Sequence, residues 1–204
     1  MGQMTDIRQL KRELRSRSRA IREGMEPARK LAADQAIFRR FTAGAFYQKA
    51  HTLLCFASTP IEVDTWPLLR QALTDGKRLA LPTCLDARGT MDFFLVRSLD
   101  ELRPGRFSLW EPSPERAPRL DSYRGSVCVL PAFAFDPEGY RIGFGKGYYD
   151  RFLQRYTGLK VGVCYNSCIA PSLPHGRYDA AADYLVTPKY TMTIRAGARG
   201  GSTE

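Results

Sequence analysis

Apolar side chains near the N-terminus recur at helical spacing. Ile7, Leu10, Leu14 and Ile21 are separated by three, four and seven residues, and Arg and Lys occupy many of the positions between them. One face of such a helix is apolar and the remaining faces are basic. The pattern therefore predicts an amphipathic basic helix over residues 5–23.

A second helix is expected to begin at Pro27. Proline suits the first turn of a helix, because the N–H group that it lacks would have no helical partner there. Apolar residues at helical spacing continue from this point to about Gln48. Two helices over residues 1–48 are therefore expected to open the chain.

The rest of the chain alternates short apolar runs with helical segments. Apolar runs bounded by Gly, Pro or polar residues are typical of buried strands. Strands are expected at 51–58, 78–84, 91–98, 126–135, 160–165 and 183–188. Helices are expected at 65–76 and 148–156, and a Pro-rich loop at 104–118.

Strands that alternate with helices, several of them apolar on both faces, indicate an α/β fold with a mostly parallel sheet. We expect an α/β sandwich that forms a single domain over residues 1–190. The small and polar residues 191–204 are expected to form a flexible tail. Ligands of such sheets bind beyond the carboxyl ends of the strands, so the loop after strand 126–135 is the first candidate site.

That loop is rich in glycine and leads into the predicted helix 148–156. Glycines let a backbone approach an anion closely, and a helix N-terminus offers unpaired N–H groups. Arg141 and Lys146 would add charge-assisted hydrogen bonds to phosphate oxygens. The sequence GFGKGYYD is not a P-loop, because no Ser or Thr follows Gly145 and Lys146 as that motif requires. A triphosphate site is predicted, and a turn-rich connection without a ligand is the alternative.

Carboxylates near this loop are candidate Mg²⁺ ligands. Asp150 lies in the first turn of the predicted helix, where it could hold Mg²⁺ or simply stabilise the helix N-terminus. Asp179 and Asp183 flank the last strand, and either could supply a second carboxylate. The spacing does not choose between them.

A second group of polar residues follows the first predicted strand. Asp64 or Thr65 is expected to cap the helix 65–76. Glu62 comes too early for that role. It could accept hydrogen bonds from the N–H groups of a heterocycle, or it could be an ordinary surface carboxylate.

The charge of the chain suggests a polyanionic partner. The 31 Lys and Arg residues against 21 Asp and Glu residues give a net charge of +10 at pH 7. Residues 1–40 hold eleven of these basic residues against five acidic ones. Nucleic acid, a nucleotide phosphate and a poly-acidic small molecule all fit this excess. Lys11, Arg15 and Arg19 form a cationic stripe on the first helix, and such stripes usually face solvent.

The composition excludes several classes of protein. With 204 residues, 44% of them hydrophobic, the chain can form a core that needs no disulfide or structural metal. No apolar run approaches the ~18 residues of a membrane span, and no signal-peptide pattern is present. We therefore expect a cytoplasmic protein without membrane contact.

The five cysteines indicate buried, reduced thiols. Their number is odd, and four of them lie in apolar runs. Cys164 and Cys168 are four residues apart, but His51 and His175 are the only histidines, so a zinc site is not expected. The histidines also lack a neighbouring nucleophile signature.

Several segments together resemble the 5-formyltetrahydrofolate cyclo-ligase family, also called methenyltetrahydrofolate synthetases. The most specific is LPAFAFDPEGYRIGFGKGYYDRFL at 130–153, which is similar to the family's apolar strand, Gly-rich loop and Tyr-Tyr-Asp pattern. The supporting segments are KRELR at 11–15, IEVDT at 61–65, FSLWEP at 107–112 and YDAAADYLVTP at 178–188. The resemblance runs from about Lys11 to Pro188.

The resemblance implies an activity and a fold. It implies a ligase that uses ATP and Mg²⁺ to convert 5-formyltetrahydrofolate into 5,10-methenyltetrahydrofolate, with release of ADP and phosphate, in one-carbon metabolism. The implied fold is a three-layer α/β/α sandwich, Rossmann-like and of the NagB/RpiA/CoA-transferase type. The implied partner is a reduced folate, polyglutamylated, and a monomer is expected.

The resemblance also implies roles for individual residues. Lys146, Arg141 and Tyr148 would be catalytic, with Lys146 stabilising the transferring phosphoryl group. Glu62 would bind the pterin, and Asp150 and Asp179 would hold Mg²⁺ with Asp183 behind them. ATP would be bound by Lys11, Arg15, Arg141, Ile142, Gly143, Phe144, Gly145, Lys146, Gly147, Tyr148 and Tyr149. The folate would be bound by Glu62, Ala57, Phe107 and Tyr149.

The chain departs from the family pattern at three positions. Phe144 stands where many relatives carry a basic or small residue, Ser108 replaces a usual glycine, and Cys168 takes a position that is often Gln. These departures bear on substrate affinity. They keep open a second hypothesis, a protein of the same fold that binds a nucleotide or phosphate ligand without cyclisation.

A nucleic-acid-binding protein is a third, disfavoured hypothesis. The charge and the basic helix favour it, and such binding would fall steeply with salt. Phe38, Phe41 and Phe46, however, are spaced like helical core residues rather than like a platform on which bases stack. We therefore expect no nucleic-acid partner.

Overall fold

The structure is a computed structural model that describes residues 6–105 and 109–194. A sheet with the strand order β11-β10-β9-β6-β1-β2-β3 forms its centre. The neighbouring strands from β10 to β2 pair in parallel, and β3 and β11 close the two edges as antiparallel strands. The predicted α/β fold with a mostly parallel sheet is thus confirmed. The strands are β1 (Thr52–Leu54), β2 (Arg78–Cys84), β3 (Met91–Val96), β6 (Ser126–Leu130), β9 (Leu159–Val163), β10 (Tyr184–Val186) and β11 (Thr191–Thr193).

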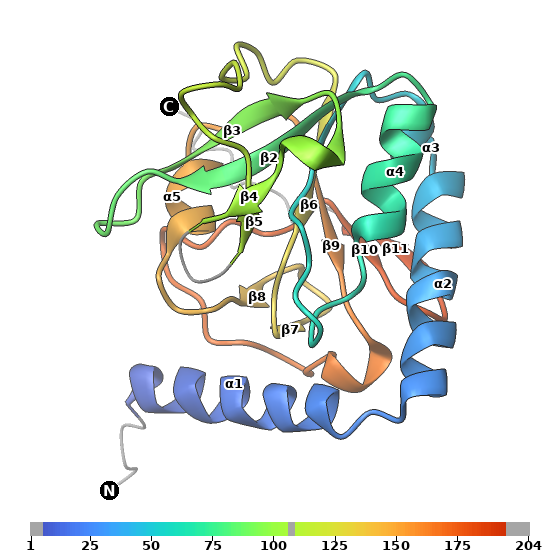
Figure 1. Cartoon of the computed structure of the whole chain (residues 1–204). Helices are drawn as coiled ribbons and strands as arrows, with labels where there is room; N and C mark the ends of the chain where they lie inside the picture. The colour runs from blue at the N-terminus through green and yellow to red at the C-terminus, as the bar shows by residue number, and fades with distance from the viewer. Residues whose placement is uncertain (1–5, 106–108, 195–204) are drawn as a thin grey trace, which may run out of the picture.

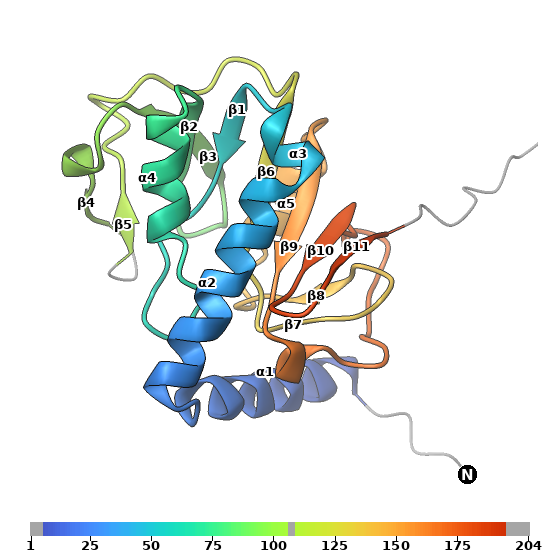
Figure 2. The same ribbon diagram turned by 90° about the vertical axis from the view of Figure 1, so that its right-hand side faces the viewer.

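Helices cover both faces of the sheet, which gives the predicted three layers. Figure 1 shows α2 and α4 on one side and α5 on the other, with α1 lying across the end of the sheet. Figure 2, turned by 90°, shows α2 running over the face that α4 also covers. The helices are α1 (Ile7–Glu23), α2 (Pro27–Ala43), α3 (Ala45–Gln48), α4 (Trp66–Thr74) and α5 (Tyr148–Leu153), with 3₁₀ turns at η1 (Leu99–Glu101) and η3 (Asn166–Cys168).

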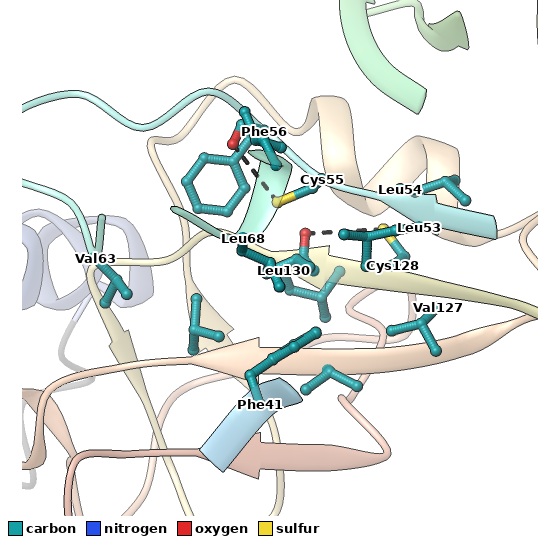
Figure 3. Packing of buried hydrophobic residues seen from close by; sticks show 14 of the residues in the cluster. Phe41, Leu53, Leu54, Cys55, Phe56, Val63, Leu68, Val127, Cys128 and Leu130 are labelled. Atoms are coloured by element: carbon teal, nitrogen blue, oxygen red, sulfur yellow. Dashed lines mark hydrogen bonds between the residues drawn. The ribbon is translucent and has the colours of Figure 1, made fainter. Parts of the chain in front are cut away.

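The core lies between α2 and the central strands. Phe41 of α2 and Leu53 of β1 have no exposed surface, and Val127 of β6 is almost as buried. Figure 3 shows these side chains packed together with Cys55 and Cys128. Burial raises the pKa of both thiols well above the usual value. All five cysteines are free, as predicted, and four of them are buried, but Cys84, which was also predicted to be buried, is partly exposed.

Helix α1 is anchored to the loops at the end of the sheet by Arg22. This side chain is buried, and its Nη2 atom donates hydrogen bonds to the carbonyl oxygens of Ala132 and Phe133. The guanidinium also lies 5.4 Å from the centre of the Phe133 ring and 5.8 Å from that of Tyr165. One buried cation thus ties α1 to the segments that follow β6 and β9. No helix among the described residues is long and apolar enough to cross a bilayer.

The second predicted helix is interrupted at Gly44. Its backbone is extended, with φ −68° and ψ 137°, so α2 ends at Ala43 and the short α3 follows. A Cβ atom on Gly44 would lie 2.5 Å from the ring of Phe46. The glycine lets Phe46 and Tyr47 turn back into the core, which a continuous helix to Gln48 would prevent.

The predicted strand 126–135 is also divided. Strand β6 ends at Leu130, and β7 (Ala134–Phe135) pairs instead with β8 (Arg141–Ile142) as an antiparallel ribbon. The buried carboxylate of Asp136 holds the turn between them, because it accepts hydrogen bonds from the N–H groups of Glu138 and Tyr140. The ribbon directs the Gly-rich loop toward α1.

Two further predictions were wrong in detail. The expected loop 104–118 contributes to a small ribbon of β4 (Arg103–Pro104) and β5 (Trp110–Glu111). Residues 191–193, predicted to belong to the flexible tail, form β11, which pairs with β10 through hydrogen bonds. The alternating sequence Thr-Met-Thr suits an edge strand. An edge strand pairs with one neighbouring strand and does not need a continuous apolar run.

Candidate functional site

A cavity of about 690 Å³ opens at the carboxyl ends of β1 and β6. The chain leaves β1 toward β2 on one side and later returns as β6 on the other, so the strand order reverses between these two strands. Ala57 after β1 and Pro131 after β6 both line the cavity. The site therefore lies where ligands bind in open α/β sheets, next to the Gly-rich loop that the sequence singles out.

One wall of the cavity is the cationic stripe of α1. Lys11, Arg15 and Arg19 all line the cavity, so the stripe faces the site instead of open solvent. The Nε atom of Arg15 donates a hydrogen bond of 2.8 Å to the carbonyl oxygen of Gly143. The Nζ atom of Lys11 lies 3.1 Å from Oδ2 of Asp179. Helix α1 is thus bound both to the Gly-rich loop and to the segment that carries Asp179.

The opposite wall is the Gly-rich loop with the start of α5. Gly145 and Gly147 have φ of +93° and +71°, in the left-handed region that favours glycine. Gly147 is the N-cap of α5, and the side chain of Lys146 beside it is exposed and lines the cavity. Arg151 holds the loop from behind by donating to the carbonyl oxygen of Lys146. The glycines thus bring backbone and one lysine to the cavity.

Arg141 is a buried cation in the same wall. Only 4% of its side chain is exposed. Its Nη1 atom donates to the carbonyl oxygen of Ala180 at 2.8 Å, and its Nη2 atom is paired with Asp150. These contacts fix the guanidinium at the cavity, where it can face a phosphoryl group without reorganisation.

The two carboxylates expected to bind Mg²⁺ lie in one cavity. Asp150 and Asp179 both line it, and each is paired with a cation, Arg141 and Lys11 respectively. Burial raises the pKa of Asp179, but the N–H group of Gly176 and the ammonium of Lys11 outweigh it, so the pKa is lowered and the carboxylate is ionised at neutral pH.

This donor set fits Mg²⁺ rather than a metal held by protein alone. No group of three or more His, Cys, Asp or Glu side chains among the described residues could enclose an ion. Mg²⁺ needs only one or two carboxylates when phosphates and waters complete its shell. Asp183 does not line the cavity, and it is paired with Lys160 at 3.2 Å.

Glu62 is a buried carboxylate, not a surface one. It is 5% exposed, and its Oε2 atom accepts hydrogen bonds of 2.7 and 2.8 Å from the N–H and hydroxyl groups of Thr59. Burial raises its pKa. Its side chain lines the cavity together with Ala57. A buried acceptor at this position suits a ligand with N–H donors.

The expected cap of α4 is divided between two residues. Thr65 occupies the N-cap position, but its hydroxyl donates to the carbonyl oxygen of Phe56 instead of capping the helix. Asp64 accepts the hydrogen bond from the N–H group of Trp66 at 3.0 Å. These contacts keep the loop after β1 close to the sheet.

The two tyrosines of the predicted site differ in their hydroxyl groups. The Tyr148 hydroxyl donates to the carbonyl oxygen of Asp86 at 2.7 Å. The Tyr149 hydroxyl is buried and has no hydrogen-bond partner among the described residues, and burial raises its pKa. Both residues line the cavity. An unpaired buried hydroxyl beside a cavity suits a polar ligand group.

The three departures from the family pattern have different surroundings. Phe144 lines the cavity, is 46% exposed, and has its ring centre 4.5 Å from that of Phe133. Cys168 is buried and does not line the cavity. Ser108, like the expected folate contact Phe107, lies outside the described residues.

Sequence reasoning missed the apolar side of the cavity. This side is formed by the end of the first strand, the β2–β3 hairpin and β5, and it includes Phe56, Pro82, Met91, Leu109 and Trp110. Trp110 belongs to the segment FSLWEP, so the motif itself carried a signal. The hairpin residues carried none, because only the antiparallel pairing of β3 with β2 brings Met91 beside Cys84.

Comparisons with known proteins agree on one family. The model of the 5-formyltetrahydrofolate cyclo-ligase family matches residues 7–188. The 5-formyltetrahydrofolate cyclo-ligase of Escherichia coli K12 is 34% identical over 143 residues, which cover 68% of this chain and 79% of the relative. A probable 5-formyltetrahydrofolate cyclo-ligase of Caenorhabditis elegans is 25% identical over 90% of this chain and 95% of the relative.

A solved structure shows the same fold. The NMR structure of the 5,10-methenyltetrahydrofolate synthetase of Aquifex aeolicus superposes with a TM-score of 0.82 and 32% sequence identity. The superposition covers 92% of this chain and 94% of that one. The residues matched by the family model, 7–188, include α1 and the Gly-rich loop.

Proposed function

We propose, since the chain belongs to the 5-formyltetrahydrofolate cyclo-ligase family, that it cyclises 5-formyltetrahydrofolate to 5,10-methenyltetrahydrofolate. The reaction consumes ATP, requires Mg²⁺ and releases ADP and phosphate. One observation carries the proposal. A single cavity is lined by five cations, Lys11, Arg15, Arg19, Arg141 and Lys146, and by the buried carboxylate of Glu62.

The chemistry needs charge neutralisation rather than a protein nucleophile. The oxygen of the formyl group on N5 attacks the γ-phosphorus of ATP, and the bond between this phosphorus and the oxygen of the departing ADP breaks. N10 then attacks the formyl carbon, the C–O bond to phosphate breaks, and N10 loses its proton. Negative charge develops on the transferring phosphoryl group, which Lys146 and Arg141 would stabilise. Positioning both substrates in one cavity would supply much of the remaining rate enhancement.

The nucleotide and the metal are assigned to the Gly-rich side of the cavity. Lys11 and Arg15 would face the phosphates from α1, and residues 142–149 would wrap them from the loop. Asp150 and Asp179 would hold Mg²⁺, which, when bound, neutralises charge on the phosphates. Arg141 and Lys11, which pair with these carboxylates, would contact the same phosphates.

The folate is assigned to the side of Glu62. Its carboxylate would accept hydrogen bonds from N–H groups of the pterin, and Ala57 would border the ring. The buried hydroxyl of Tyr149, which has no partner among the described residues, would pair with a polar group of the folate. Two of these contacts are buried, so a ligand without matching polar groups would bind poorly.

The excess of positive charge supports a polyglutamylated folate as the substrate. Several basic residues of α1 lie at the cavity, and the net charge of the chain is +10. The carboxylates of a polyglutamate tail would be attracted to these basic residues. We propose that the protein acts as a monomer in the cytoplasm, where it meets both substrates.

The proposal is tested by an absorbance assay. Purified protein is mixed with MgATP and 5-formyltetrahydrofolate, and the methenyl product is followed at its own absorption band. A rise that needs both substrates is expected. A flat trace in a sample that still binds ATP by calorimetry would favour a nucleotide-binding protein without cyclisation, which the exposed Phe144 in the loop supports. Reversion of Phe144 to a basic residue would then be the next variant.

A further inference from the structure

The loop that carries Glu62 depends on support from outside itself. It runs from the end of β1 to the start of α4 and lines the cavity with Ala57, Thr59 and Glu62. The carboxylate of Glu62 is held by Thr59 of the same loop. Such internal bonds fix the shape of the loop but leave its direction relative to the cavity undefined.

Two buried side chains from distant elements supply that support. Tyr165, just after β9, has its hydroxyl oxygen 2.6 Å from Oδ1 of Asp34 and 3.1 Å from the carbonyl oxygen of Glu62. Asp34, on α2, accepts a hydrogen bond of 3.2 Å at the same Oδ1 atom from the N–H group of Asp64. The two residues thus hold the backbone on both sides of Val63.

The network is buried and includes an ion pair. Tyr165 is 2% exposed and Asp34 is 7% exposed. The Nζ atom of Lys30, one turn earlier on α2, lies 2.7 Å from Oδ2 of Asp34. Hydrogen bonds to a buried charge are stronger than bonds between neutral groups. The contacts of Asp34 and Tyr165 therefore fix the backbone that carries Glu62.

We propose that Asp34 and Tyr165 are positioning residues. They hold Glu62 in the orientation that binds the folate, and they do not contact the folate themselves. Neither residue lines the cavity, so their effect on the folate acts through the backbone of the loop. The inference rests on the proposed function, because Glu62 is assigned to the pterin there. It predicts a defect that concerns the folate and spares ATP.

Tyr165→Phe is the decisive variant, with Tyr156→Phe as its matched control. Tyr156 is also a buried tyrosine, and its hydroxyl lies 2.9 Å from Oγ of Ser126, at the opposite end of the strands from the cavity. Both variants lose a buried hydrogen bond and keep the ring, so both should show a lower Tm. Only Tyr165→Phe should raise the KM for 5-formyltetrahydrofolate, by about tenfold, while the KM for ATP stays within about twofold.

Two variants of Asp34 give a graded comparison. Asp34→Asn keeps an acceptor oxygen for Tyr165 and Asp64 and should retain more folate affinity than Asp34→Ala. Calorimetric titration with 5-formyltetrahydrofolate in the absence of ATP measures this directly. If Asp34→Ala does not fold, Tyr165→Phe alone still decides the proposal.

Equal folate KM values for Tyr165→Phe and Tyr156→Phe would overturn the positioning role, and so would a parallel rise in the KM for ATP. These results require an active wild-type protein. A wild-type protein that neither binds nor turns over the folate would instead overturn the proposed function, and the positioning role with it. The two failures are therefore distinguishable.

Discussion

Arg15 donates a hydrogen bond of 2.8 Å from Nε to the carbonyl oxygen of Gly143. The two residues are 128 positions apart, and the bond joins α1 to the Gly-rich loop across the cavity. Among residues 6–105 and 109–194, the rest of this guanidinium makes no other hydrogen bond, so its Nη atoms can contact a ligand. Arg15 thus both joins the two walls of the cavity and supplies positive charge to it. A substitution of Arg15 therefore tests both roles.

Arg15→Ala should raise the KM for ATP by roughly tenfold or more, because a charge-assisted contact and the support of the loop are lost together. Steady-state kinetics with varied ATP measures this. Arg12→Ala is the control, since Arg12 lies on the same helix, is exposed and does not line the cavity. Similar effects of the two variants would mean that only the total charge of α1 matters.

Lys146→Ala should lower kcat by ~100-fold, because a cation that faces the developing negative charge is removed. The side chain is exposed, so the Tm should change little. Lys189→Ala removes an exposed lysine away from the cavity and should leave kcat unchanged. An unaltered kcat for Lys146→Ala would exclude this residue from the phosphoryl transfer.

Asp150→Asn should increase the Mg²⁺ concentration needed for half-maximal activity by about tenfold, because an attraction between unit charges is lost. It should also lower the Tm, since the buried Arg141 loses its carboxylate partner. Asp183→Asn is the control, because Asp183 is also paired with a basic residue but does not line the cavity. Identical Mg²⁺ titrations for Asp150→Asn and the wild type would contradict the assignment of the ligand.

Glu62→Gln should separate stability from function. Burial raises the pKa of Glu62, so the ionised carboxylate costs folding free energy once the pH rises through the folded-state pKa. The variant should therefore be at least as stable as the wild type at pH 7 in urea unfolding, and any advantage should vanish at a pH below the unfolded-state pKa. Its KM for the folate should rise by at least about tenfold. If Glu62→Gln were less stable than the wild type by the same amount at both pH values, burial would not disfavour the ionised form of this carboxylate.

Much of the fold was predictable because it depends on local patterns. The strand 78–84 is found as predicted, since its apolar run is short and ends in polar residues. The segment 27–48 was predicted as one helix, and the break at Gly44 that divides it into α2 and α3 was not predicted. It exists because the ring of Phe46 folds back over the glycine, and helical periodicity does not register such a contact.

The residues of the site were easier to predict than their partners. The sequence pointed to the Gly-rich loop, the α1 stripe, Glu62 and the two aspartates, and the structure brings them to one cavity. It did not reveal that Glu62 is buried or that Asp183 is turned toward Lys160. Burial and pairing depend on which strands become neighbours, and a single sequence does not state that.

The sequence by itself determined the class of fold, the order of helices and strands, and the chemical character of the site, because hydrophobic period, glycine spacing and charge are local properties. Only the tertiary structure decided which groups face each other. Arg15 meets Gly143, Lys11 meets Asp179, and Asp34 meets Tyr165 across more than 120 positions. Such contacts arise when the sheet order and the packing of α1 and α2 are set by burial of the whole core, so no local pattern contains them.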